Sequence, residues 1–186
     1  MLGGVAEEFG IRPVGEAERQ ALRACHPREV LRKLNVPLWK VPRIAGRLRQ
    51  LKAQQAERLQ LFPGVVELLR DLARRGIDRA IVSSDAEANV RRTLGPETAA
   101  LVAHYACGAG LFGKPPRLRG VLRRAGVRVQ EAIYVGDELR DADAARAVGI
   151  AFGAVSWGYA TPDALRALSP DRLFTSIEEI APAIAG

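Results

Sequence analysis

At 186 residues, with 48% hydrophobic and 26% charged residues, the chain has the size and composition of one globular core with at most a small appended lobe. No stretch is apolar enough to span a membrane and no secretory leader pattern opens the chain, so we expect a cytoplasmic protein with no membrane partner. The net charge of +7 lies mostly in residues 1–60, which hold twelve basic and six acidic side chains. Such a region either attracts anions or is a solvated, arginine-rich helical surface.

Residues 1–60 show only helical periodicity. The predicted helices are the run with Leu2, Val5 and Phe9, then Glu16–Ala24, then His26–Leu34, and a longer amphipathic segment with Ile44, Leu48, Leu51 and Leu59. A loop bracketed by Pro37 and Pro42 separates the last two. We therefore predict an all-helical lobe over residues 1–60, joined to the rest of the chain at Leu61–Gly64.

Residues 61–186 alternate between strand and helix patterns. The predicted strands are Arg79–Val82, Val102–Cys107, Ala132–Val135, Ile150–Val155 and Arg172–Phe174. The predicted helices are Val65–Arg75, Ala86–Leu94, Arg117–Ala125, Asp141–Val148, Ala164–Leu168 and Ile177–Ile184. This alternation predicts an α/β fold with a Rossmann-like parallel sheet flanked by helices, in which ligands bind at the carboxyl ends of the strands.

Polar side chains with suitable chemistry follow three of these strands. Ser83 can donate to a phosphate oxygen while Ser84 or Asp85 caps the next helix, although capping without any ligand is the simpler interpretation of this segment. Lys114, between a glycine and two prolines, can neutralise a phosphate or a carboxylate, or it can be a solvated loop residue. Asp137 and Asp141 offer the oxygen ligands that Mg²⁺ prefers, while the simpler interpretation makes them a loop residue and a helix N-cap.

Taken in this order, a hydroxyl, a lysine and a Gly-Asp-x-x-x-Asp segment resemble the motifs of the haloacid dehalogenase-like (HAD) hydrolases, especially the phosphoglycolate phosphatase-like branch. The resemblance covers the whole chain, with residues 1–60 similar to the helical cap and residues 61–186 similar to the core. It implies Mg²⁺-dependent hydrolysis of a small phosphate monoester. In that scheme Ser83 and Lys114 hold the phosphoryl group, and Asp137 binds the metal with support from Asp141.

The first motif of that family, an Asp-x-Asp-Gly-Thr segment that supplies the nucleophile, has no counterpart here. No aspartate occurs before Asp71, and Glu7 and Glu8 lie in a helical pattern without a preceding strand. The resemblance places the missing strand between those that precede Ser83 and Asp137, so these two strands should lack a partner on their facing edges. We expect a truncated sequence that is inactive alone, because covalent catalysis needs its nucleophile.

Several other residues have weaker functional signals. His26 and His104 have no triad-like partners, and Trp157 is expected to pack rather than to line a site. The two cysteines, Cys25 and Cys107, have no metal-like spacing. In the cap-like region, the arginines that can meet the distal anion of a substrate are Arg23, Arg28, Arg43 and Arg47.

Three alternative functions remain beside the phosphatase hypothesis. A non-catalytic binding module would keep the scaffold and an anion pocket. A receiver-like phosphoacceptor domain would order its acids and lysine differently and carry no such lobe. Specific nucleic-acid binding is disfavoured, because the basic region has only Phe9 and Trp39 as aromatics and no known nucleic-acid-binding motif. The substrate and the oligomeric state are open.

Overall fold

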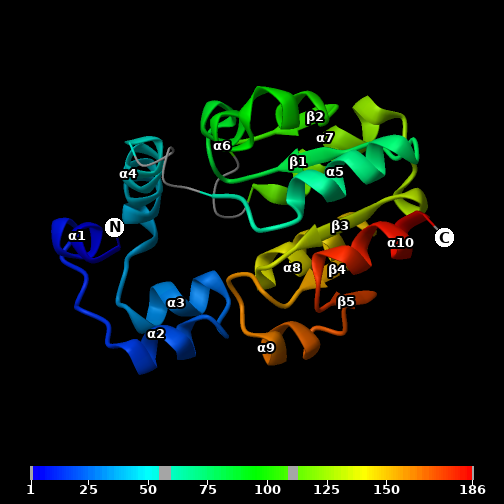
Figure 1. Cartoon of the computed structure of the whole chain (residues 1–186). Helices are drawn as coiled ribbons and strands as arrows, with labels where there is room; N and C mark the ends of the chain where they lie inside the picture. Colours follow the sequence, from blue (N-terminus) through cyan, green and yellow to red (C-terminus); the bar gives the residue numbers. More distant parts are fainter. Residues whose placement is uncertain (1, 55–59, 109–112, 186) are drawn as a thin grey trace.

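The computed structural model describes residues 2–54, 60–108 and 113–185. Figure 1 shows a group of helices beside a larger α/β part; we call residues 2–54 the lobe and residues 60–185 the core. The helices of the lobe are α1 (Leu2–Glu8), α2 (Glu16–Leu22), α3 (Pro27–Lys33), a 3₁₀ turn at Leu38–Lys40, and α4 (Val41–Gln54). No helix of the described residues is long and apolar enough to cross a membrane.

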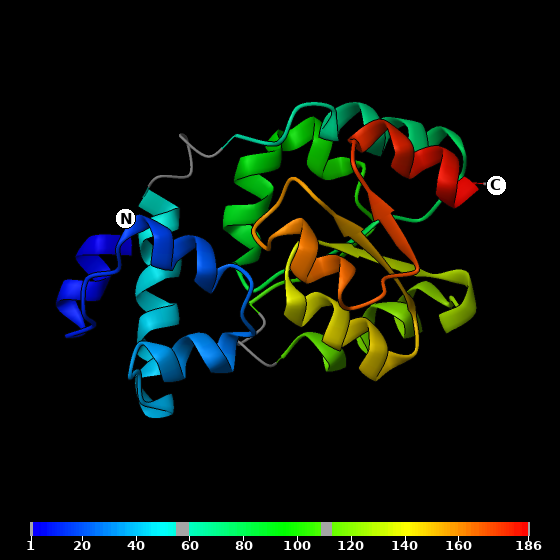
Figure 2. The ribbon, with the colours of Figure 1, turned by 90° about the horizontal axis from the view of Figure 1, so that it is seen from below.

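The core alternates strands and helices as predicted. Its strands are β1 (Ala80–Val82), β2 (His104–Ala106), β3 (Ile133–Gly136), β4 (Ala151–Val155) and β5 (Arg172–Phe174). Its helices are α5 (Val65–Arg74), α6 (Glu87–Ala100), α7 (Lys114–Ala125), α8 (Leu139–Val148), α9 (Pro162–Arg166) and α10 (Ile180–Ala185), with 3₁₀ turns at Val129–Glu131 and Ile177–Glu179. In Figure 2 these helices lie on both sides of the strands, which confirms the α/β fold class.

All strand pairs are parallel, but they form two sheets. One joins β1 to β2, and the other has the order β3-β4-β5. In Figure 1 β1 lies between β2 and β3, yet no ladder connects β1 with β3 among the described residues. This agrees with the expectation that the strands before Ser83 and Asp137 have no partner on their facing edges. The three central residues of β4 are buried, whereas every residue of β3 is only half-buried.

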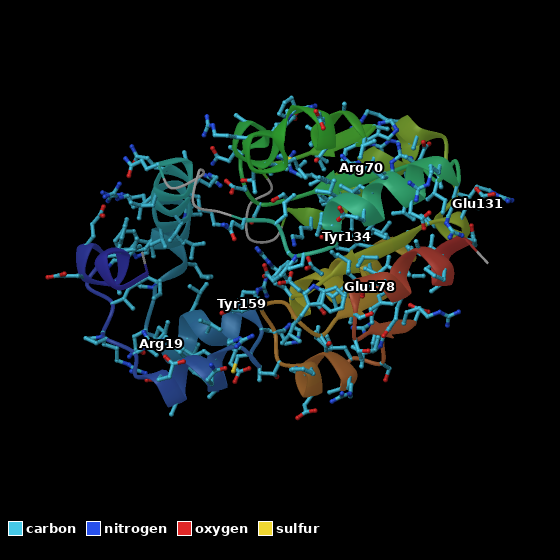
Figure 3. The ribbon with its side chains drawn as sticks, viewed as in Figure 1. Arg19, Arg70, Glu131, Tyr134, Tyr159 and Glu178 are labelled. Carbon is cyan, nitrogen blue, oxygen red and sulfur yellow. The ribbon has the colours of Figure 1, made fainter. Side chains whose placement is uncertain are left out.

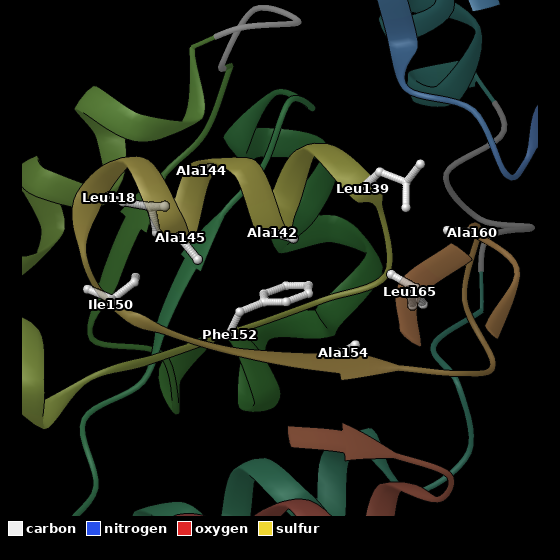
Figure 4. Packing of buried hydrophobic residues seen from close by; sticks show 10 residues of the cluster. All are labelled: Leu118, Leu139, Ala142, Ala144, Ala145, Ile150, Phe152, Ala154, Ala160 and Leu165. Atoms are coloured by element: carbon white, nitrogen blue, oxygen red, sulfur yellow. The ribbon is translucent and has the colours of Figure 1, made fainter. Parts of the chain in front are cut away.

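The hydrophobic core is centred on the packing of α8 against β4 (Figure 4). Small side chains allow this close approach: Ala145 and Ala154 have no exposed surface, and Leu165 of α9 is also completely buried. Val82 of β1 packs against the same cluster, so side chains join the two sheets although backbone hydrogen bonds do not. Burial of this apolar surface fixes α8, and with it the polar residues at the end of β3.

One helical stretch was not predicted and one helix begins earlier than predicted, and both differences have a conformational cause. The predicted helix Ala86–Leu94 ends where expected, because Gly95 has non-helical backbone angles with φ at 74°; a second helical stretch follows from Pro96 to Ala100, and α6 spans both. The helix predicted to begin at Arg117 begins instead at Lys114. Its two prolines occupy the first turn, where a missing N–H costs nothing.

In the lobe, the predicted loop between Pro37 and Pro42 is largely helical, with a 3₁₀ turn followed directly by α4. Pro42 is tolerated because it lies in the first turn of α4. The predicted apolar face of this helix includes Ile44 and Leu48, which line a cavity facing the core. Leu59 lies outside the described residues.

Candidate active site

The turn from β3 into α8 carries the two acids of the Gly-Asp-x-x-x-Asp segment. Asp137 follows β3 directly, and Glu138 is the N-cap of α8. Asp141 is therefore the third residue of the helix rather than its N-cap, and its carboxylate accepts the N–H of Glu138 in a capping box. Gly136 makes this arrangement possible, because a Cβ at that position would lie 2.8 Å from the Cβ of Asp141.

Lys114 and Asp141 form a buried ion pair across the gap between α7 and α8. Only 7% of Lys114 and 2% of Asp141 is exposed. The hydroxyl of Tyr134 in β3 also donates to Asp141, at 3.0 Å. Burial and the neighbouring Asp141 charge raise the pKa of Tyr134, which keeps this phenol protonated as a donor. Asp141 is thus fully engaged by a lysine, a phenol and a backbone amide.

Asp137 lies against the turn that follows β4. Its Oδ2 accepts the N–H of Tyr159 at 2.7 Å, and its backbone carbonyl accepts the N–H of Ala160 at 2.9 Å. Burial raises the pKa of the Asp137 carboxyl, and the hydrogen bond from Tyr159 acts in the opposite direction. A desolvated carboxylate of this kind gains from a nearby cation.

Ser83 follows β1, and within the part of the chain that the structure describes no hydrogen bond joins it to Lys114 or to either acid. Its Oγ accepts the N–H of Asp85 at 3.1 Å in a local turn. Neither Ser84 nor Asp85 is the N-cap of α6; that position is Ala86, with no side-chain cap. The link between the β1 and β3 turns is instead Arg140, which donates to Ser84 Oγ at 3.4 Å and pairs with Glu138.

Two cavities lie next to these residues. The larger, of about 670 Å³, is lined by lobe residues from Arg23 to Lys52 together with core residues from three turns. Its charged lining residues are Arg23, Arg49, Lys52, Asp85, Glu138 and Arg140. The smaller, of about 380 Å³, is lined by His26, Arg28, Lys114, Arg140 and Asp143 among others. Arg140 and Pro27 therefore border both cavities, and Lys114 borders the smaller one.

The remaining predicted site residues differ in whether they line one of these two cavities. Of the four lobe arginines predicted to meet a substrate anion, Arg23 lines the larger cavity and Arg28 the smaller, whereas Arg43 and Arg47 line neither. Arg47 pairs instead with Glu8 at 2.8 Å. His26 lies 3.2 Å from Asp143 of α8.

Residues with weaker signals occupy structural positions. His104 is a half-buried residue of β2, and Trp157 is half-buried in the turn after β4. Both cysteines are free. Burial raises the pKa of the Cys107 thiol, which makes it less reactive.

The donor set fits a hard cation only in part. Within the described ranges, no group of three or more His, Cys, Asp or Glu side chains is gathered closely enough to hold a metal. Asp137 offers one carboxylate at the end of β3, while Asp141 is engaged by Lys114. Since Mg²⁺ can be held by one or two carboxylates with water and phosphate completing its shell, Asp137 is chemically suited to it but insufficient alone.

A parallel α/β core with a helical lobe, and with a lysine and two acids near the carboxyl end of β3, defines the class of open α/β folds that bind ligands at their strand ends. The family model for haloacid dehalogenase-like hydrolases matches residues 2–155, more than half of the sequence. The chain belongs to this family.

Individual relatives agree with that assignment. The chain is 31% identical over 180 residues to the phosphoglycolate phosphatase of Synechococcus elongatus, an alignment that covers 96% of this chain and 85% of the relative. It is 32% identical over 111 residues to that of Pseudomonas savastanoi, spanning 58% of this chain and 41% of the relative. A haloacid dehalogenase-like hydrolase structure from Streptococcus pneumoniae superposes with a TM-score of 0.76 at 18% identity, covering 96% of this chain and 86% of that one.

Sequence reasoning did not identify three residues that matter for the geometry. Tyr134 appeared as an ordinary strand residue, although a tyrosine in a buried strand needs a partner for its hydroxyl. Arg140 and Tyr159 were also missed. Arg140 lies between Glu138 and Asp141 in the acidic segment, which was the one available signal; nothing in the sequence indicated that the backbone of Tyr159 would bind Asp137.

Proposed function

We propose that this chain provides the phosphate-handling part of a phosphatase acting on a small phosphate monoester, of the kind that phosphoglycolate represents. The observation that carries the proposal is the buried Lys114–Asp141 pair directly beside Asp137 at the carboxyl end of β3. A buried lysine held by a carboxylate is a preorganised positive charge, and phosphoryl transfer depends on such charges. Family membership and the similarity to phosphoglycolate phosphatases support the same reaction class.

In this proposal each residue has a separate role. Lys114 and Ser83 hold the phosphoryl oxygens, and Asp141 keeps Lys114 in position. Asp137 is the protein ligand of Mg²⁺, which when bound neutralises charge on the phosphoryl group. The raised pKa of Asp137 supports this role, because a carboxylate that burial disfavours is stabilised by a divalent cation.

The part of the substrate distant from the phosphate would lie in the larger cavity between the lobe and the core, next to Arg140, which also borders the smaller cavity that Lys114 lines. Arg23 reaches this cavity from the lobe and Arg140 from the core, so an anionic group distant from the phosphate would find positive charge on both sides. Two of the cations that line this cavity, Lys52 and Arg140, have acidic neighbours, which limits its net positive charge. A small monoester with one further anionic group fits this distribution.

Hydrolysis needs a nucleophile that these 186 residues do not supply in the expected place. The earliest aspartate, Asp71, lies on α5 and is held by Arg74 and Arg75. Glu8 lies on α1 in the lobe and pairs with Arg47. We therefore infer that the chain by itself binds phosphate without turning it over. The alternative function, a non-catalytic binding module, also predicts phosphate binding without hydrolysis by this chain. The two hypotheses differ only in whether a longer polypeptide would hydrolyse the phosphate ester.

Phosphate binding tests the proposal. Isothermal titration with inorganic phosphate in the presence of Mg²⁺ should show binding by the 186-residue protein. Lys114→Gln should abolish it, and Ser83→Ala should weaken it about tenfold by removing one hydrogen bond to a charged group. Lys33→Gln, which alters a lysine paired with Glu29 in the lobe, is the matched control and should bind normally.

Circular dichroism establishes that each variant is folded. If Lys114→Gln does not fold, Ser83→Ala still tests the proposed phosphate binding. This variant should fold, because the hydrogen bond of the Ser83 side chain lies within a local turn. Failure of the native protein to bind phosphate, or equal binding by native protein and Ser83→Ala, would contradict the proposed roles.

A further inference from the structure

Arg23 joins the lobe to the core through two hydrogen bonds. A further hydrogen bond between the two parts runs from Asn89 to the carbonyl of Arg49 at a long 3.4 Å. The ion pairs His26–Asp143, at 3.2 Å, and Lys52–Asp85, at 3.9 Å, also connect the lobe and the core. Of these contacts, the two that Arg23 makes are the shortest.

Arg23 binds two consecutive carbonyl groups of the turn after β4. Its Nε donates to the carbonyl of Tyr159 at 2.5 Å, and one terminal nitrogen donates to the carbonyl of Gly158 at 3.0 Å. The other terminal nitrogen donates to Gln20 Oε1 at 3.0 Å, which fixes the guanidinium from the lobe side. The planar fork of arginine suits two neighbouring acceptors in a way that the single ammonium of lysine does not.

The same two peptide groups hold Asp137 from their opposite ends. The Gly158–Tyr159 peptide offers its carbonyl to Arg23 and its N–H to Oδ2 of Asp137, at 2.7 Å. The Tyr159–Ala160 peptide offers its carbonyl to Arg23 and its N–H to the carbonyl of Asp137, at 2.9 Å. Each peptide group is therefore a bridge with the arginine on one side and the aspartate on the other.

Two physical effects follow from this double bridge. A cation on the carbonyl polarises a peptide group and strengthens the hydrogen bond that its N–H donates. The bridge also fixes position: a Cβ on Gly158 would lie 2.0 Å from the Cβ of Asp137, so the turn is pressed directly against the aspartate. Displacement of the turn would therefore displace or release the Asp137 carboxylate.

We propose that Arg23 is a positioning residue: by docking the lobe onto the turn at Gly158–Ala160, it orients the carboxylate of Asp137. Its consequence for the reaction rests on the proposed function, in which Asp137 is the metal ligand. Groups that orient a ligand from behind commonly change metal affinity by one to two orders of magnitude, roughly 10- to 100-fold. The position of the lobe and the geometry of Asp137 are thus coupled through two peptide groups.

Arg19 offers a matched control, and its position is labelled in Figure 3. Tyr159 lies on the side of the core that faces the lobe, whereas Arg19 lies on the lobe away from the core. Arg19 belongs to the same helix region as Arg23, is 58% exposed, and pairs with Glu16 at 2.9 Å. Arg19→Ala removes the same charge from the lobe without touching the bridge.

Amide resonances provide the direct test. In ¹H–¹⁵N spectra, Arg23→Ala should shift the Tyr159 and Ala160 amide protons upfield and accelerate their exchange with solvent. The reason is that the two peptide groups lose the cation on their carbonyls, so their N–H groups donate weaker and less fixed hydrogen bonds to Asp137. Arg23→Lys should give an intermediate result, since it keeps the charge but not the fork. Arg19→Ala should leave both signals unchanged. Titration with Mg²⁺ alone should show roughly tenfold weaker binding by Arg23→Ala.

The outcomes separate this inference from the proposed function. Unchanged Tyr159 and Ala160 signals in Arg23→Ala would overturn the positioning role, whatever happens to Mg²⁺ binding. A native protein that binds no Mg²⁺ would instead refute the proposed metal role of Asp137, while the amide signals would still decide whether Arg23 orients it. If Arg23→Ala is unfolded, comparison of Arg23→Lys with Arg19→Ala gives the same decision.

Discussion

At the scale of single residues, Lys114 and Asp141 depend on each other. Both are almost completely buried, and charges removed from water are tolerated only when they are paired and hydrogen-bonded. Asp141 is further satisfied by Tyr134 and by the N–H of Glu138. The positive charge at the end of β3 is therefore a property of this small network rather than of the lysine alone.

A double-mutant cycle tests this interdependence. Lys114→Met and Asp141→Leu should each lower the free energy of unfolding by about 3–5 kcal/mol, because each leaves the other charge buried without its partner. The double variant should recover a large part of that loss. Urea denaturation measures all three. Arg166→Met, at an exposed pair with Asp163, is the control and should change stability by less than about 1 kcal/mol. Additive effects of the two buried substitutions would contradict the account.

Glycine sets the geometry around both acids. Gly136 and Gly158 are each so close to an aspartate that any side chain would displace it. Gly136 belonged to the predicted motif, but the reason for Gly158 was not visible in the sequence, because its contact joins two turns separated by about twenty residues. Acidic residues at strand ends can be predicted from the sequence, whereas the backbone segments that contact their side chains cannot.

At the scale of the elements, strands and helices were predicted well because their apolar periodicity is regular. All five core strands were identified within three residues at either end. The differences occurred where conformation depends on one or two residues: a second helical stretch of α6 follows the kink at Gly95, and the prolines of α7 fit its first turn. This last difference matters for the site, because it places Lys114 on a helix rather than in a loop.

The facing edges of β1 and β3 lead to a measurable difference in protection. Every second amide of a strand points to the same neighbour, so alternate amides of Ile133–Gly136 face β1 without a ladder partner there. Hydrogen exchange at these alternate positions should be faster than in β4 by about tenfold or more, since β4 is paired on both sides. Uniform protection across β3 and β4 would show that the edge is covered in solution.

At the scale of the whole molecule, the sequence indicated a helical region and an α/β core, but not how they meet. The assignment of Arg23 to a substrate anion followed from charge alone. The structure shows that this side chain also contacts the turn that holds Asp137, a contact between residues about 135 positions apart in the sequence. Such contacts depend on how the lobe docks, and no local pattern encodes that.

Ser83 also shows that local sequence patterns do not determine how distant segments meet. Its position after β1 was correctly predicted, yet no ladder joins the two sheets among the described residues, and no hydrogen bond there links Ser83 to Lys114 or to the acids. A motif predicted from strand ends assumes that the strands are adjacent. Where β1 and β3 are not hydrogen-bonded to each other, the distance between their turns is not fixed by sheet geometry.

Turnover of p-nitrophenyl phosphate by the purified 186-residue protein, with Mg²⁺ present, tests the central claim most directly. The account predicts no hydrolysis above that of the Asp137→Ala variant, because the chain holds the lysine and the acid proposed to bind the metal but not the nucleophile that covalent phosphoryl transfer requires. Clear turnover by the native sequence that disappears in Asp137→Ala would contradict it, and would show that another residue of this chain serves as the nucleophile.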